Sequence, residues 1–130
     1  MNLKDYFKKG KFYVWKETFA IVKSRKYLPN VFAVIRDKNE ITVIINQSKI
    51  KNNKNIIKID KNWRIITFDM VLPFGLIGLF ARISKILANK RVSIFVISAY
   101  STDHILIKEK DVEKTVKTLE SIGFIVKQKI

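Results

Sequence analysis

The residues best suited to chemistry in this 130-residue sequence surround a strand-to-helix turn, "VLPFGLIG", at positions 71–78. Pro73, Gly75 and Gly78 interrupt an apolar run just before an apolar helical stripe. A helix N-terminus presents unpaired backbone N–H groups at the positive end of the helix dipole, so it suits a carboxylate. Glycines have no Cβ and let a ligand approach those N–H groups closely. The same glycines also suit a purely architectural role, in which Gly75 permits the turn and Gly78 lets the helix pack on the sheet.

A second group of polar side chains follows a later apolar strand. Ser98, Ser101 and Thr102 offer hydroxyls, and the carboxylate of Asp103 could accept from an ammonium group or close the hairpin by an Asx-type turn bond. Together with the turn, these residues predict a site for a small zwitterion. The candidate ligand-binding residues are Asp69, Leu72, Pro73, Phe74, Gly75, Leu76, Ile77, Gly78, Phe95, Ile97, Ser98, Ala99, Tyr100, Ser101, Thr102 and Asp103.

Other kinds of site are not indicated by the sequence. Cysteine is absent and His104 is the single histidine, so we predict no metal site and no cofactor, and we expect His104 at the surface or at a strand edge. There is no P-loop, no dinucleotide-binding glycine motif, no nucleophile elbow and no pair of acids at a spacing that serves acid–base catalysis. We therefore expect a protein that is not an enzyme.

The elements that must position the candidate site lie in the second half of the chain. Apolar residues spaced three and four apart predict a helix from Gly75 to Asn89, and Asp111 is expected to cap a second helix that ends at Gly123. The order of elements from 63 to 128 is β-α-β-β-α-β, which is the ferredoxin-like unit. The strands of that unit are predicted at 63–71, 92–100, 104–109 and 124–128.

The first half of the chain repeats part of this order. A strand is predicted at 11–17, a segment at 18–28 fits either a helix or a strand, and a hairpin is predicted at 31–46. A polar connector follows at 47–62, with room for a short strand at 56–59. The predicted fold class is therefore α+β, with two tandem ferredoxin-like modules of which the first is shortened. The predicted boundaries are 1–62 for the first module and 63–130 for the complete second one.

Four motifs of the second half resemble those of the ACT domain family. They are Phe74–Gly75–Leu76–Ile77–Gly78, "SIFVIS" from Ser93, "TDHILI" from Thr102 and "KEKDV" from Lys108. The resemblance covers about residues 63–128, and 1–62 agrees in element order only, as a degenerate ACT-like module. Tandem ACT proteins of similar length include the CASTOR-type amino-acid sensors.

This resemblance implies a non-catalytic regulatory protein. Such a protein would bind a small ligand, such as an amino acid, at an interface between ACT modules. Exposed edges of the sheet favour at least a homodimer. No apolar run is long enough to cross a bilayer and no leader sequence is evident, so we expect a cytoplasmic protein without a membrane partner.

The formal net charge of +15 suggests an alternative function. Clustered lysine and arginine release counterions from nucleic acid, so the chain could be a basic nucleic-acid-binding module on a ferredoxin-like sheet. Phe12, Tyr13 and Trp15 would then be its exposed aromatic residues. Base composition explains the charge equally well, because lysine, isoleucine and asparagine share A/T-rich codons and only five of the basic residues are arginine.

Overall fold

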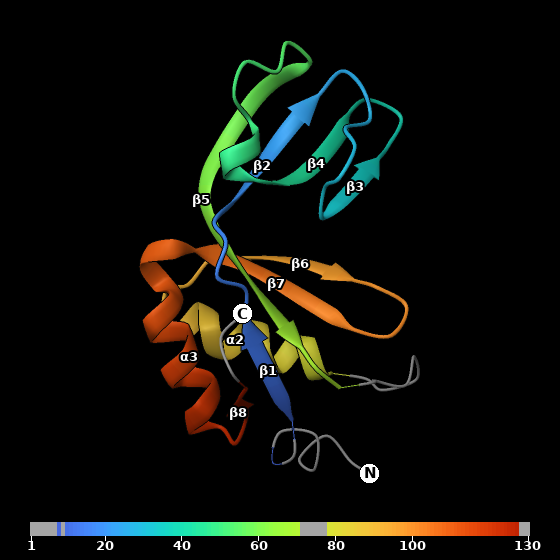
Figure 1. Cartoon of the computed structure of the whole chain (residues 1–130). Coiled ribbons are helices and arrows are strands. Elements are labelled where there is room, and N and C mark those ends of the chain that lie inside the picture. Colours follow the sequence, from blue (N-terminus) through green and yellow to red (C-terminus); the bar gives the residue numbers. More distant parts are fainter. Residues whose placement is uncertain (1–7, 9, 71–77, 128–130) are drawn as a thin grey trace. The chain divides into compact units, whose positions relative to one another are not determined.

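The computed structural model describes residue 8, residues 10–70 and residues 78–127, which form two compact units (Figure 1). One unit, which we call the composite unit, comprises Met1–Lys16 and Arg64–Ile130. The other, which we call the inserted unit, comprises Glu17–Trp63. The compact units thus differ from the predicted division after residue 62, because the first strand of the chain belongs with the second half. The interpretation of 1–62 as a degenerate ACT copy stays a prediction.

The composite unit contains a five-stranded sheet. Its strands are β1 (Lys11–Val14), the second part of β5 (Ile56–Phe68), β6 (Ile94–Ser98), β7 (Asp103–Lys108) and β8 (Ile125–Val126). Their order in the sheet is β8-β1-β5-β7-β6, with β1 antiparallel to β5 and parallel to β8. The helices α2 (Leu79–Asn89) and α3 (Val112–Ser121) complete the predicted β-α-β-β-α-β order. A short 3-10 turn, Glu109–Asp111, precedes α3.

The core of the composite unit joins both helices to one face of this sheet. The buried stripe of α2 is Leu79, Ile83 and Leu87, at the spacing that places side chains on one helix face. This stripe packs in one cluster with the phenylalanines of β1 and β5 and with Leu119 of α3. The ring centroid of Phe68 lies 5.5 Å from that of Phe124, in the edge-to-face arrangement that aromatic pairs prefer.

The ends of α3 confirm one prediction and correct another. Gly123 has φ 113°, so it ends the helix in a conformation that glycine adopts without steric cost. Asp111 stands at the N-cap position, but its side chain makes no capping hydrogen bond. Its Oδ1 lies 3.7 Å from Nζ of Lys114 instead, which still leaves a negative charge beside the positive end of the helix dipole.

The inserted unit is a four-stranded antiparallel sheet. Its strands are β2 (Phe19–Ser24), β3 (Ala33–Arg36), β4 (Ile41–Asn46) and the first part of β5, in the order β3-β4-β2-β5. The segment that fitted helix or strand is therefore β2, and residues 17–63, all of which the structure describes, form only one 3-10 turn, Gln47–Lys49, and no α-helix. One hydrophobic cluster of this unit comprises Ala20, Val22, Leu28, Val43 and Ile45, and Phe19, Ile44 and Trp63 are also buried.

The predicted hairpin at 31–46 is confirmed as β3 and β4. Asp37 closes it, because its Oδ1 accepts from the backbone N–H groups of Asn39 at 2.7 Å and of Glu40 at 2.9 Å. These two hydrogen bonds lower the pKa of the Asp37 carboxyl below its usual 3.8.

The short strand expected at 56–59 is confirmed, but the connector predicted around it is wrong for residues 60–62, which also belong to a strand. Residues 56–68 form one 13-residue strand, β5, which continues through the stretch that reads as polar. Lys58 and Asp60 pair with β2 in an antiparallel ladder, although both side chains are exposed. Strand pairing satisfies the backbone whatever the side chains are, so hydrophobic patterning alone misses an exposed strand of this kind.

Candidate functional site

The predicted ligand site is described in part. Leu72, Pro73, Phe74, Gly75, Leu76 and Ile77 lie outside the described residues, so their role stays a prediction. The structure places the other ten candidates at the end of β5, at the start of α2 and in the β6–β7 hairpin.

Gly78 forms the N-cap of α2 with φ 91°. A residue with a Cβ is disfavoured at this positive φ, so the backbone itself explains the glycine. Its carbonyl accepts from the N–H of Arg82 at 3.0 Å, as the carbonyl of an N-cap residue does. Neither a capping side chain nor an acid in the first turn is found among the described residues. The positive end of the α2 dipole therefore lies where the sequence predicts an anion site.

Asp69 follows β5 and is half-buried. Its backbone N–H donates to the carbonyl of Lys11 at 2.8 Å, and its carboxylate forms an ion pair with Lys127. A ligand ammonium that used Asp69 as acceptor would have to share or displace this lysine.

The β6–β7 hairpin carries the remaining candidates. Ile97 lies opposite His104 and Ser98 lies opposite Asp103, so Phe95 and Ile97 share one face while Ser98 projects from the other. The bond that closes the turn is a backbone bond, from the N–H of Ala99 to the carbonyl of Thr102 at 2.9 Å. Ser101 is exposed, and Tyr100 is 84% exposed.

His104 was expected at the surface or at a strand edge, and the structure shows this to be wrong. The side chain is buried on β7, which pairs with β5 on one side and β6 on the other. Its Nδ1 lies 2.8 Å from Oγ1 of Thr67, and that oxygen accepts from Nε1 of Trp15 at 2.7 Å. Oγ1 of Thr102 lies 3.4 Å from the other ring nitrogen. A polar chain thus crosses from β7 through β5 to the end of β1.

Burial lowers the pKa of His104 below its usual 6.5, and the nearby charge of Asp103 opposes this in part. The ring is accordingly neutral at pH 7. An indole can only donate, so the Thr67 hydroxyl accepts from Trp15 and can donate its own hydrogen to Nδ1 of the neutral imidazole. The burial of His104 has one signal in the sequence. The apolar run that follows His104 directly indicates a strand that is buried on both faces.

The aromatic residues expected for a nucleic-acid surface are arranged differently. Phe12 is fully buried in the core of the composite unit, so its expected exposure is wrong. Tyr13 and Trp15 are half-buried, with ring centroids 6.4 Å apart.

The described residues lack two further features. Among them, no three His, Asp or Glu side chains come together in a way that could hold a metal ion. Within the same residues, neither the length nor the apolar character of any helix is sufficient to span a membrane.

Residues 58–121 match the family model for an ACT domain. This range begins within β5 and ends with α3, so it includes Gly78, the β6–β7 hairpin and both helices. Residues 58–121 are therefore similar to an ACT domain, at the place where the sequence motifs resemble that family.

Solved structures extend the likeness to most of the chain. Protein Atu0741 of Agrobacterium tumefaciens aligns over 92% of this chain and 95% of its own, with a TM-score of 0.76 and 20% identity. VC0802 of Vibrio cholerae, a protein of unknown function, aligns over 94% and 96%, with a TM-score of 0.78 and 17% identity. The ligand-free regulatory subunit of aspartate kinase from Thermus thermophilus aligns over 87% and 95%, with a TM-score of 0.62 and 7% identity. At these identities the likeness concerns the fold, and it confirms the predicted α+β ACT-type fold in tandem organisation.

Proposed function

We propose that this protein is a non-catalytic regulatory module that binds a small ligand, an amino acid, at the strand-to-helix turn of its ACT domain. The observation that carries the proposal is the N-terminus of α2 within the ACT match. It has a left-handed glycine at the N-cap and neither a capping side chain nor an acid in its first turn. Such a terminus favours a carboxylate, which every amino acid carries.

Other candidate residues of the composite unit support a zwitterionic ligand. Asp69 offers an ammonium acceptor at the end of β5, and Ser98 and Ser101 are exposed hydroxyls in the β6–β7 hairpin. The fold is also that of a regulatory subunit of aspartate kinase, which is a regulatory rather than a catalytic chain. The more specific similarity to CASTOR-type amino-acid sensors, and the location in the cytoplasm, stay predictions from the sequence.

We further propose that the site is completed by an ACT module of a second copy. Among the described residues, β6 pairs with β7 alone, so its other edge presents unpaired backbone groups that can pair with another strand. Sedimentation analysis should give at least a dimer, and a monomer at all concentrations would contradict this part of the proposal.

A thermal-shift screen with the twenty amino acids at millimolar concentration tests the proposal. We expect some amino acids to raise the melting temperature and others to leave it unchanged, because a ligand that binds the native state stabilises it. Gly78→Asn should weaken this response, since asparagine tolerates positive φ but places a side chain over the helix terminus. Gly123→Asn makes the same change at the positive-φ glycine after α3 and should keep the response. The absence of a shift with every amino acid would refute the proposal.

The basic charge does not single out one unit as a nucleic-acid surface. The inserted unit has ten Lys and Arg against four Asp and Glu, and the composite unit has sixteen against seven. Such an even spread is what biased composition produces. The nucleic-acid alternative stays a prediction, and salt-dependent binding to an RNA pool would support it.

A further inference from the structure

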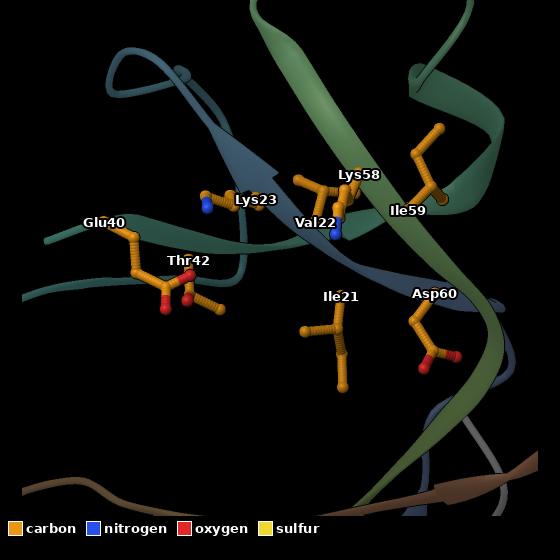
Figure 2. Close-up of a pocket in the computed structure, with 8 residues that line it drawn as sticks. All are labelled: Ile21, Val22, Lys23, Glu40, Thr42, Lys58, Ile59 and Asp60. Carbon is orange, nitrogen blue, oxygen red and sulfur yellow. The ribbon is translucent and has the colours of Figure 1, made fainter.

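The inserted unit has a charged depression on one face of its sheet (Figure 2). We propose that this depression is a binding site, separate from the strand-to-helix turn, for a small molecule that carries both a carboxylate and an ammonium group. Its volume is about 440 Å³, and its lining residues are Ile21, Val22, Lys23, Glu40, Thr42, Lys58, Ile59 and Asp60.

The centre of the site is a row of three polar side chains across three strands. Lys23 of β2 lies directly opposite Thr42 of β4 on one side and Lys58 of β5 on the other. Residues so placed have Cβ atoms about 5 Å apart. Two adjacent lysines repel each other, and this repulsion destabilises the sheet when no ligand is bound. An anion that binds between the two ammonium groups reduces the repulsion. The row thus offers a carboxylate two ammonium groups and a hydroxyl.

Two acids flank this row. Asp60 lies opposite Ile21, one diagonal step from Lys23, and its Oδ1 accepts from Nε1 of Trp63 at 3.0 Å. That bond holds the Asp60 carboxylate in place. Glu40 stands two residues before Thr42 and projects from the same face of the sheet.

These charges are held apart from one another. No ion pair joins Lys23, Lys58 or Glu40 to a residue in the described part of the chain. The side chains of Glu40, Thr42, Ile21 and Asp60 project to the same side of the strands in Figure 2. Lys23, Lys58 and Glu40 therefore keep their capacity to bind a charged group of a ligand.

The balance of charge selects the class of ligand. Two lysines and two acids sum to zero, which matches a neutral zwitterion. A ligand with only an anionic group would be repelled by Glu40 and Asp60, and one with only a cationic group would be repelled by the lysines. Ile21 adds an apolar contact. The choice of an amino acid as ligand rests on the proposed function, whereas the position of the site rests on the inserted sheet alone.

Amide resonances of the full-length, 15N-labelled protein test this inference during titration with the twenty amino acids. We expect at least one amino acid to shift the resonances of Lys23, Thr42 and Lys58 in a saturable manner. Its carboxamide and its N-acetyl derivative, which each lack one of the two charges, should bind at least about tenfold more weakly, because a hydrogen bond between charged groups is lost.

Three variants give the controls. Lys58→Gln should weaken binding at least about tenfold and Lys58→Arg should largely keep it, because arginine preserves the charge. Lys54→Gln removes the same charge from an exposed lysine that does not line the depression, and it should bind as the natural protein does.

The outcomes separate this inference from the proposed function. Shifts confined to Gly78 and the first turn of α2, unchanged by Lys58→Gln, would overturn the second site and leave the proposed function intact. Shifts confined to β2, β4 and β5 that Lys58→Gln removes would support the second site and refute an amino-acid site at the strand-to-helix turn. The absence of shifts in both regions would refute both the second site and the proposed function.

Discussion

The two units of this protein bury their sheets in different ways. The composite unit packs two helices against one sheet face, and its core includes three phenylalanines from β1, β5 and the residue before β8. The inserted unit has no α-helix, and besides a cluster of five aliphatic residues it buries Phe19, Ile44 and Trp63. Four of its large apolar residues, Val34, Ile35, Ile57 and Ile59, are 38–44% exposed. The comparison indicates that the composite unit supplies most of the stability, while the inserted unit keeps charged side chains available on its sheet.

The largest expected effect comes from the aromatic core. Phe68→Ala should lower the free energy of unfolding by about 3–5 kcal/mol, because a large buried side chain is lost and a cavity remains. Ile59→Ala, at a residue of the inserted unit that is 44% exposed, should cost about 1 kcal/mol or less. Urea denaturation measures both. Equal losses in the two variants would contradict the division of stability between the units.

The next effect concerns the buried polar chain. Thr67→Val should cost about 1–3 kcal/mol, because it removes the buried hydroxyl that bonds both the Trp15 indole N–H and the His104 ring. The same change at Thr42, a half-buried threonine of the inserted sheet, is the control and should cost much less. A Thr67→Val protein as stable as its parent in thermal and urea unfolding would show that the buried polar side chains do not contribute to stability.

A smaller effect is the dependence of stability on pH. The pKa of His104 is lower in the folded protein than its usual 6.5, so the unfolded state binds a proton first as the pH falls. The contribution to stability is complete above about pH 7 and is lost as the pH drops from 6.5 through the folded pKa, at most by about 1.4 kcal/mol per pH unit. His104→Gln should remove this slope between pH 7.5 and 5. A parent protein whose unfolding free energy is flat over that range would contradict the prediction.

The smallest effect is expected at the surface. Lys127→Gln breaks the ion pair with Asp69, and both side chains are more than two-fifths exposed. Solvent screens such pairs, so the free energy of unfolding should change by less than about 1 kcal/mol. The variant is more informative for binding, because it frees the Asp69 carboxylate for an ammonium group. Amino-acid affinity should therefore stay equal or rise, and a large loss would show that Lys127 itself contacts the ligand.

The sequence predicted the local elements better than their assembly. Apolar alternation located the β3–β4 and β6–β7 hairpins, and the stripe of Leu79, Ile83 and Leu87 located α2. The nested units could not be predicted, because β1 pairs with two strands that are more than fifty residues away and local patterning carries no information on such pairing.

The candidate site shows the same limit. Gly78 at the start of a helix was predicted from a local motif, and the structure supplies a positive φ that explains it. The depression on the inserted sheet was missed, because Lys23, Thr42 and Lys58 are far apart in the sequence and only the strand register brings them into one row. The role of His104 was missed because burial depends on the neighbouring strands.

The most direct test of the central proposal is calorimetric titration of the protein with the amino acids that raise its melting temperature, in parallel with the Gly78→Asn variant. We predict saturable binding of at least one amino acid to the natural protein, and weaker binding to Gly78→Asn because the site at the start of α2 is lost, while Gly123→Asn binds as the natural protein does. Binding of equal affinity to all three proteins would contradict an amino-acid site at the start of α2.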